Sequence, residues 1–352
     1  MVRKHKRVVI IGKVRVGGDN PIAVQSMTKT KTSDTKKTLN QIRRVARAGC
    51  EIIRCAVVNR EDAEALGQIR KLSPIPVIAD IHFDYRLALA AIDAGVDKIR
   101  INPGNIGEPH KVKRIINKAI ERHIPIRIGI NSGSLPASIL KKHGHPTVAA
   151  VVETVQQSLA VFVENGFNDI VISAKGVDVR DTVETYQVLN EQFDYPLHLG
   201  ITEAGLLFEG SIKSAVGMGI LLHAGIGDTI RVSLTADPVY EVAAAYEILG
   251  SLGLRRHGPV LISCPMCGRC EVDIVRIARD VEKRLKKYKN FMKIAVMGCV
   301  VNGPGEAREA DFGIACGKGV GAVFARGKEI RRVKEKDLVD NLFEVIDENF
   351  DN

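Results

Sequence analysis

Short runs of apolar and β-branched residues recur along the first 250 positions, separated by longer segments with the apolar spacing of an amphipathic helix. The predicted strands are Ile22–Met27, Glu51–Cys55, Pro76–Ile81, Lys98–Ile101, Pro125–Ile130, Asp169–Ser173, Leu197–Ile201 and Thr229–Ser233. Glycine stands just before several of these strands, where it commonly ends a helix. Eight strand–helix units in succession predict a closed (β/α)8 TIM barrel.

An open, doubly wound sheet is the alternative arrangement for such units. It would carry a glycine-rich phosphate-binding turn after its first strand, and the segment Gln25–Thr28 is not such a turn. Further towards the N-terminus, Gly12 and Lys13 separate two short apolar runs, 8–11 and 14–16. This pattern predicts a small hairpin that closes the bottom of the barrel.

The last hundred residues are organised differently. We interpret the segment Gly250–Gly258 as a linker, because it combines three glycines with basic residues. The elements predicted beyond it are strands 259–262, 293–297 and 311–315, helices 272–287 and 338–348, and a hairpin of 322–325 with 328–333. The charged run 326–337 is expected to be a solvated face. We therefore predict two domains, a TIM barrel over residues 1–256 and a smaller α+β domain over residues 257–352.

The charge balance adds a preference for anions. The 51 Lys and Arg outnumber the 41 Asp and Glu, and the formal net charge is +10. Tryptophan is absent and aromatic residues make up 5%, which argues against a base-stacking nucleic-acid surface. The excess charge fits a small anionic ligand, or it simply favours solubility. No apolar run reaches the roughly 20 residues of a membrane span, and the N-terminus lacks signal-peptide features, so we expect a cytoplasmic protein.

Polar and charged residues stand at or just after the carboxyl ends of the predicted strands. They are Arg54, Asp80, His82, Arg100, Arg127, Asn131, Lys175, Glu203, Arg231 and Ser233. These ends meet at one mouth in a barrel, where TIM-barrel active sites are built. Cations that converge there form a pocket for a multiply charged, oxygen-rich anion, and a diphosphate fits this description. His82 and Glu203 could transfer protons, although a histidine such as His82, taken alone, is more often a hydrogen-bonded core residue than a catalyst.

The seven cysteines are unevenly distributed, with five between Cys264 and Cys316. The spacing C-x₂-C-x₂-C over 264–270, with Cys299 further along, fits either an iron–sulfur cluster or a four-cysteine zinc site. Zinc ribbons usually use two C-x₂-C knuckles, and only one is complete here, so the spacing favours a cluster. By spacing alone Cys270 is the preferred fourth ligand. The other cysteines are expected to pack as small buried side chains.

Two cysteine motifs and several barrel segments together resemble one family, that of 4-hydroxy-3-methylbut-2-enyl diphosphate synthase. The cysteine motifs are Cys264-Pro-x-Cys267-Gly-Arg269 and Gly298-Cys299-Val-Val-Asn302-Gly-Pro-Gly305-Glu306. The barrel segments are 24–28, 52–54, 79–82, 98–105, 127–131, 202–205 and 230–233. The resemblance runs from about residue 14 to residue 320, and its specificity comes from the order of all the segments.

This resemblance implies a reductive enzyme of isoprenoid precursor biosynthesis. The substrate would be 2-C-methyl-D-erythritol 2,4-cyclodiphosphate, opened by two electrons with loss of a hydroxyl as water. A 4Fe–4S cluster would be held by Cys264, Cys267, Cys299 and Glu306, with ferredoxin or flavodoxin as electron donor. The family also implies a homodimer whose active site lies between the barrel of one chain and the cluster domain of the other. Cys270 is not required by the family pattern and is the rival of Glu306.

The resemblance also assigns roles to the residues at the mouth. The residues implied to contact the diphosphate are Arg54, Arg100, Arg127, Lys175 and Arg231, assisted by Asn131 and Ser233. Asp80, His82 and Glu203 would handle the substrate hydroxyl and protons, with Glu203 as the first choice for general acid.

Two further hypotheses come from other functional classes. A pterin-type synthase barrel with an appended structural zinc module would use the same anion pocket and need no electrons. A zinc-stabilised RNA-binding protein would explain the isoelectric point of about 9.2, and the shortage of aromatic residues counts against it.

Overall fold

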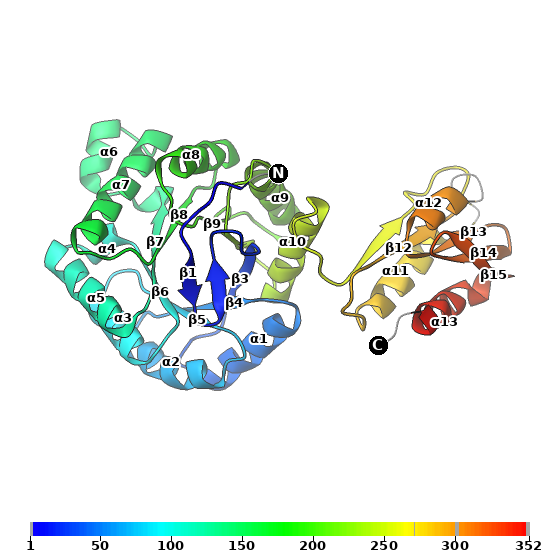
Figure 1. The fold of residues 1–352 in the computed structure, drawn as a ribbon, viewed down its shortest axis with the longest axis horizontal. Helices are drawn as coiled ribbons and strands as arrows, with labels where there is room; N and C mark the ends of the chain where they lie inside the picture. Colours follow the sequence, from blue (N-terminus) through cyan, green and yellow to red (C-terminus); the bar gives the residue numbers. More distant parts are fainter. Residues whose placement is uncertain (1–2, 271, 300–302, 350–352) are drawn as a thin grey trace. The chain divides into compact units, whose positions relative to one another are not determined.

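The computed structural model describes residues 3–270, 272–299 and 303–349. The chain divides into two compact units, Met1–Arg255 and Arg256–Asn352, which are described separately below (Figure 1). Among the described residues, no helix combines the length and apolar character needed to cross a membrane.

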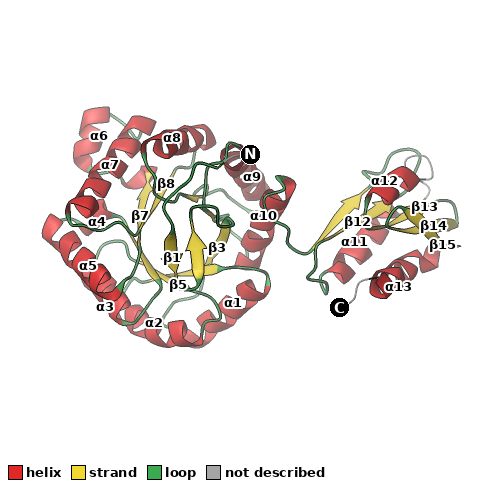
Figure 2. Ribbon diagram, in the orientation of Figure 1, coloured by secondary structure: helices red, strands yellow, loops and turns green. Residues whose placement is uncertain are grey.

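The first unit is built around a ring of eight parallel strands, as the sequence predicts. The strands are β3 (Ala23–Met27), β4 (Ile52–Ala56), β5 (Val77–Asp80), β6 (Lys98–Ile101), β7 (Ile126–Asn131), β8 (Ile170–Lys175), β9 (His198–Leu199) and β10 (Thr229–Ile230). Their order is β8-β7-β6-β5-β4-β3-β10-β9, and a parallel bridge between Ile172 and Leu197 joins the two ends. Figure 2 shows the strands inside and the helices outside. The barrel is therefore closed.

Helices surround this ring and bury one apolar face each against it. They are α1 (Thr35–Arg47), α2 (Arg60–Leu72), α3 (Tyr85–Asp93), α4 (Pro103–Ile106), α5 (Pro109–Arg122), α6 (Ala137–His143), α7 (Val148–Glu164), α8 (Val179–Gln192), α9 (Leu207–His223) and α10 (Pro238–Ser251). In α1, Leu39, Ile42 and Val45 are buried, and the Asp34 side chain accepts a hydrogen bond from the Lys37 backbone N–H. The cap satisfies a backbone N–H at the start of the helix, and the apolar stripe is the face that packs against the barrel.

The last two strands and the linker differ from the prediction. β9 and β10 have two residues each, whereas the apolar pattern predicts five in both places. The predicted residues that follow β9 and β10 belong to loops at the mouth, where the Thr202 N–H donates to the carbonyl of Gly176 in the neighbouring loop. The predicted linker also begins too early, because Gly250 and Ser251 complete α10.

A hairpin seals the bottom of the barrel, as predicted. It consists of β1 (Val9–Ile11) and β2 (Val14–Val16), which pair antiparallel. Val9, Ile11 and Val16 form one apolar cluster with interior residues of the barrel that include Ile52 and Val171. This cluster fills the lower part of the barrel, so that solvent and ligands reach the interior from the opposite mouth.

The second unit is a five-stranded sheet with helices on both faces. Its elements are β11 (Pro259–Ser263), α11 (Ile274–Leu285), β12 (Met292–Met297), α12 (Gly303–Glu309), β13 (Phe312–Cys316), β14 (Val320–Ala325), β15 (Lys328–Lys334) and α13 (Leu338–Asn349). β11, β12 and β13 are parallel, and β14 and β15 continue the sheet antiparallel. One apolar cluster contains residues of α11 and α13, and a second, alanine-rich cluster contains Ala307 of α12. The short helix α12 was not predicted.

Candidate active site

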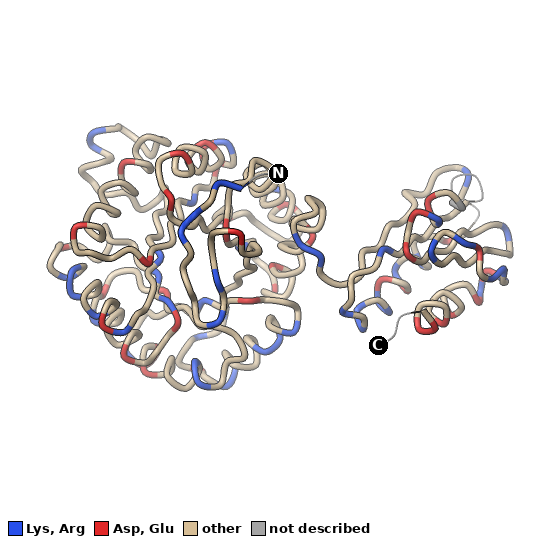
Figure 3. Tube along the Cα trace, in the orientation of Figure 1, with Lys and Arg blue, Asp and Glu red and all other residues tan. Residues whose placement is uncertain are grey.

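Cationic side chains from different strands gather inside the barrel. Because side chains alternate along a strand, Lys98 and Arg100 on β6 both point inwards. Six cationic side chains of the interior are buried or nearly buried: Arg54, Lys98, Arg100, Arg127, Lys175 and Arg231. Other Lys and Arg residues are spread over both units with Asp and Glu between them (Figure 3). The local excess of positive charge is therefore a property of the barrel interior.

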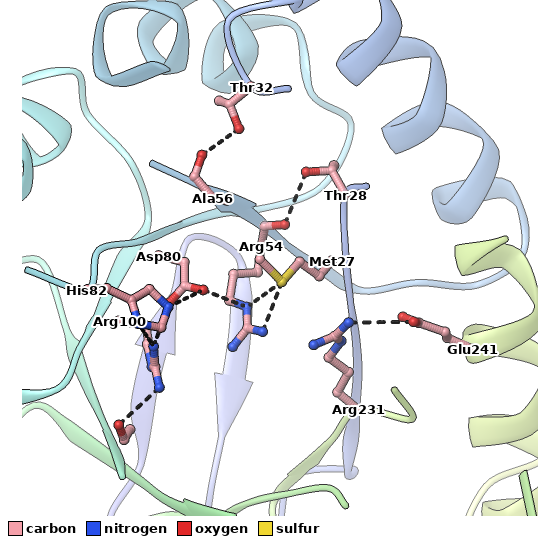
Figure 4. Close-up of polar contacts among 11 residues, drawn as sticks. Met27, Thr28, Thr32, Arg54, Ala56, Asp80, His82, Arg100, Arg231 and Glu241 are labelled. Atoms are coloured by element: carbon pink, nitrogen blue, oxygen red, sulfur yellow. Dashed lines mark hydrogen bonds and ion pairs between the residues drawn. The ribbon is translucent and has the colours of Figure 1, made fainter. Parts of the chain in front are cut away.

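Asp80 lies between two of these arginines at the end of β5. Its carboxylate is 3.1 Å from Arg100 Nη1 and 3.6 Å from Arg54 Nε (Figure 4). Arg100 Nη1 also lies 2.9 Å from His82 Nε2. Burial alone would raise the pKa of Asp80, but Arg54, His82 and Arg100 outweigh it and hold the pKa well below its ordinary value. Asp80 is therefore an anion that aligns two guanidinium groups.

Glu241 of α10 is a second buried carboxylate at the mouth, and the sequence analysis missed it. It lies 3.5 Å from Arg231 Nη2 and 3.1 Å from Lys29 Nζ, and it accepts a hydrogen bond of 2.9 Å from Ser26 Oγ. The sequence signal for Glu241 is an acidic residue on the otherwise apolar face of a helical segment. A charge buried on such a face needs a partner, which points to a site nearby. Glu241 therefore orients Arg231 from outside the ring.

The interior cations outnumber the carboxylates that could neutralise them. Asp80 and Glu241 are the two buried carboxylates found near them among the described residues, against six basic side chains. Burial, together with repulsion from Arg54, lowers the pKa of Arg231 to about 10. Burial and repulsion from Arg127, Arg231 and other cations lower the pKa of Lys175 well below its ordinary value. A multiply charged anion at the mouth relieves this repulsion, which makes the barrel interior an anion site.

Two glycines, Gly129 within β7 and Gly200 directly after β9, make room for these long cationic side chains. A Cβ added at Gly129 would collide with the guanidinium of Arg100, which donates a 3.0 Å hydrogen bond to the Gly129 carbonyl. A Cβ added at Gly200 would lie 2.5 Å from Lys175 Nζ. Glycine within a strand often marks such a close approach. In the sequence, Gly129 stands within the segment 127–131 and Gly200 within the predicted strand 197–201, and neither pattern reveals this role.

The remaining predicted residues of the mouth lie at strand ends or in the loops that follow. Asn131 is the last residue of β7 and pairs in register with Lys175. Ser233 is half-buried beyond β10, and the side chain of His82 is partly exposed. Glu203 is exposed in the loop after β9 and has a positive φ of 51°. A non-glycine residue in this conformation is held there by its surroundings, and such residues concentrate at functional sites.

In the second unit, the four residues implied as cluster ligands line one cavity. Cys264, Cys267, Cys299 and Glu306 surround a space of about 360 Å³, together with Arg269 and other residues. No described group of three or more His, Cys, Asp or Glu residues is close enough to hold a single metal ion. The cavity has room for a group of several atoms, and thiolates with a carboxylate are suitable iron ligands. The donor set therefore fits an iron–sulfur cluster.

Cys270 does not line this cavity. Its thiol donates to the carbonyl of Val272 at 3.3 Å and lies so close to Gly298 that a Cβ there would be 2.6 Å away. The three cysteines expected to be buried, Cys50, Cys55 and Cys316, are indeed buried. None of the seven cysteines, all within the described residues, forms a disulfide.

Solved structures with low sequence identity share the barrel fold. The dihydropteroate synthase of Yersinia pestis superposes with a TM-score of 0.52 and 12% identity, over 71% of this chain and 98% of that chain. The spore coat polysaccharide biosynthesis protein spsE of Bacillus subtilis gives a TM-score of 0.53 and 11% identity, over 70% and 73%. At these identities the likeness concerns the fold alone.

Sequence comparisons cover both units. Residues 6–246 match the GcpE TIM-barrel domain, and residues 260–348 match the GcpE protein C-terminal domain. A protein of Geobacter sulfurreducens named 4-hydroxy-3-methylbut-2-en-1-yl diphosphate synthase (flavodoxin) is 54% identical over 97% of both chains. A protein of Clostridium perfringens with the same name is 52% identical over 99% of both. The chain therefore belongs to the GcpE family, as the motifs of its strand ends and cysteine turns indicate.

Proposed function

We propose that this protein reductively opens 2-C-methyl-D-erythritol 2,4-cyclodiphosphate to 4-hydroxy-3-methylbut-2-enyl diphosphate, an oxidoreductase step of isoprenoid precursor biosynthesis. The observation that carries the proposal is the excess of buried cations at the barrel mouth, which suits a ligand with two phosphate groups. In the reaction, the bond between a ring carbon and a phosphate oxygen breaks and a hydroxyl group leaves as water. Two electrons enter the substrate, and the departing hydroxyl takes up a proton.

Residues 1–256 form the substrate-binding domain of this proposal. The two phosphates would be bound by Arg54, Arg100, Arg127, Lys175 and Arg231, with Asn131 and Ser233 donating further hydrogen bonds. Asp80 and Glu241 keep their arginines in place before the ligand arrives. Guanidinium groups fixed in advance lose little entropy on binding, so the ligand is held in one orientation.

Glu203 is the proposed general acid for the departing hydroxyl. The backbone N–H of Thr202 donates to Gly176, and Thr235 donates to Gly205, so the loop of Glu203 is fastened on both sides. His82, with Asp80 beside it, is the proposed second proton-handling group at the mouth. Its ring nitrogen and the Asp80 oxygen are 3.5 Å apart, and both lie beside Arg100. Glu203 and His82 can therefore hold protons next to a bound diphosphate.

Residues 257–352 form the proposed cluster-binding domain. We propose Cys264, Cys267, Cys299 and Glu306 as the ligands of a 4Fe–4S cluster, supported by the cavity that they share. Such a cluster, when bound, supplies electrons one at a time. Cys270 is excluded from our ligand set because it does not line the cavity and its thiol donates to the carbonyl of Val272. The spacing of the cysteines alone favours Cys270, but spacing does not tell in which direction a side chain points.

The proposed electron donor is flavodoxin, which is part of the name of the curated relatives, and ferredoxin is the alternative. Both are carriers of single electrons. We place the reaction in the cytoplasm, since thiolate ligands require a compartment that keeps cysteines reduced.

We also propose that the protein works as a homodimer. Along α9, Phe208, Ile212, Val216 and Ile220 follow one another at four-residue spacing and are all exposed. Tyr240 of α10 is exposed as well. Apolar residues gathered on one helix face are typical of a binding surface, and we assign a second copy of this chain to it. In this dimer, the cluster-binding domain of one copy closes over the barrel of the other.

The central test is chemical analysis of protein purified without oxygen. We expect about four iron and four sulfide per chain, a broad visible absorption that bleaches on reduction, and turnover of the cyclic diphosphate with a reduced donor. About one zinc per chain and no sulfide would contradict the redox proposal and favour the pterin-type alternative.

Glu203→Gln should separate chemistry from binding. The amide cannot donate the proton, so we expect turnover to fall by about 10²–10⁴-fold. Iron content, visible absorption and affinity for the cyclic diphosphate should be unchanged. The matched control is Glu209→Gln, an exposed acid on α9, which should retain full activity. Full activity in Glu203→Gln would remove this residue from the mechanism.

The fourth cluster ligand can be identified by comparing Glu306→Ala with Cys270→Ala. We expect Glu306→Ala to lose iron and visible absorption, because one corner of the cluster loses its protein ligand. Cys270→Ala should keep both, since that residue does not line the cavity and its thiol is bonded to the carbonyl of Val272. If only Cys270→Ala loses the cluster, the proposed ligand set is wrong.

Gly200→Ala tests the positioning of Lys175. The added methyl group would lie 2.5 Å from Lys175 Nζ and 2.6 Å from the backbone carbonyl oxygen of Arg231, so it would displace both residues, and we expect KM for the cyclic diphosphate to rise by about tenfold or more. The control is Gly67→Ala in helix α2, where a Cβ makes only an ordinary 3.9 Å contact. An unchanged KM in a folded Gly200→Ala protein would show that Lys175 does not contribute to binding.

A further inference from the structure

Beneath the arginines of the mouth lies a group of buried polar side chains that the proposed mechanism does not use. Lys98 on β6, His198 on β9 and Gln25 on β3 are fully or almost fully buried in the barrel. Lys98 Nζ, His198 Nε2 and both amide atoms of Gln25 have no hydrogen-bond partner among the described residues. Buried polar groups of native proteins are rarely left unpaired, so this group requires an explanation.

Lys98 is the most unusual member. Its strand neighbours Ile99 and Ile101 belong to the apolar core outside the ring, while Lys98 and Arg100 share the inward face. Burial, with repulsion from Arg127 and Arg54, lowers the pKa of Lys98 well below its ordinary value. An ammonium ion without a partner in such a place is costly, so burial favours the neutral amine over the charged form.

His198 is in the same situation. Its Nδ1 lies 2.6 Å from Thr229 Oγ1, which fixes the ring, while Nε2 has no partner in the described part of the chain. Burial and repulsion, chiefly from Arg127, Lys175 and Lys98, lower the pKa of His198 well below its ordinary value. In the protein without ligand, His198 is therefore neutral at physiological pH.

The surroundings of this pair are known for each neighbouring element. The charged groups that act on the pair directly are Arg54 on β4, Arg127 on β7 and Lys175 on β8. The groups that act in turn on these cations and on Arg231 are Asp80 on β5, Arg100 on β6, Tyr186 of α8 and Glu241 of α10. Both carboxylates are already engaged with arginines of the mouth. Of the basic groups, lysine and histidine have the lowest ordinary pKa values, so they respond first when the field changes.

We propose that Lys98 and His198 form a proton-accepting layer beneath the anion site, so that binding of an anionic ligand at the mouth draws protons into the barrel. The inference rests on the proposed function only in taking the cyclic diphosphate as that ligand. Each proton comes from solvent, adds to the free amine of Lys98 or to Nε2 of His198, and is released when the ligand leaves.

Electrostatics determines in which direction ligand binding shifts the pKa values of Lys98 and His198. A ligand with two negative charges enters the same low-dielectric space in which the cations repel one another, and it favours the charged forms of Lys98 and His198. Their pKa values are therefore higher in the complex than in the free protein. Affinity is greatest below the free-state values and falls as pH rises through the values of the complex. A neutral layer in the free protein also limits repulsion while the site is empty of ligand.

The proton count can be measured by isothermal titration calorimetry. The full-length protein with its cluster is titrated with the cyclic diphosphate, without reductant so that no turnover occurs, in buffers of different ionisation enthalpy between pH 6 and 8.5. Both phosphates of this ligand are fully ionised over that range and contribute no protons. We expect the wild type to take up about one proton or more per ligand, and log Kd to rise with pH by the same number per pH unit.

Two variants assign the protons. Lys98→Met fills the same space without an amine and should lower the uptake, mainly on the alkaline side of the range. His198→Gln should lower it mainly on the acidic side. The control is Lys71→Met, an exposed residue at the end of α2, which should leave the count unchanged.

The possible outcomes are distinct. Binding by the wild type with heats independent of the buffer would overturn the proton-accepting layer and leave the anion site intact. Uptake that persists undiminished in both folded variants would also overturn it and assign the protons to Lys175. A wild type that shows no binding would contradict the proposed function together with this inference.

Discussion

The structure depends on the mutual repulsion of cations confined inside a closed barrel. Six basic side chains, five of them at the mouth and Lys98 beneath, share a space with two carboxylates, and burial strengthens every interaction among the charged groups. Asp80 lies between Arg54 and Arg100, and Glu241 reaches Arg231 from α10, so each carboxylate acts where guanidinium groups would otherwise be unsupported. The remaining charge is left for a ligand. Specificity for a multiply charged anion thus arises from incomplete neutralisation of the site.

Such a site requires stability from elsewhere in the barrel. The hairpin at the bottom fills the lower interior with apolar side chains, and the surrounding helices bury a large core outside the ring. These parts hold the strands at the spacing that brings the cations together. Gly129 and Gly200 then provide room for side chains that cross the interior. The apolar cluster at the bottom of the barrel therefore contributes stability, while the charged side chains at the mouth are available for binding.

The sequence predicted the barrel and its mouth well because both follow from simple periodicities. Alternation along strands, with the rule that carboxyl ends meet at one mouth, was sufficient to collect Arg54, Arg100, Arg127, Lys175 and Arg231. Glu241 was missed because helical spacing describes only the helix that contains it. Its partners Ser26 and Lys29 are more than two hundred residues away in the sequence, and Arg231 follows the preceding strand. Lys98 was seen only as part of a motif, since a lysine in a strand gives no sign of whether its amine finds a partner. The lengths of β9 and β10 depend on hydrogen bonds between loops, which local patterns do not contain.

The cysteine motif shows why spacing and direction are separate kinds of information. Cys264, Cys267 and Cys270 stand three residues apart, and by counting alone all three are equivalent. The chain, however, turns after Cys267, and the thiol of Cys270 meets the Val272 carbonyl and the backbone of Gly298. Glu306, on a short helix that the sequence did not predict, faces the cavity instead. The proposed donor set of the second unit thus depends on where its turns direct each side chain. The proposed anion site of the first unit depends in the same way on which charges remain without a partner.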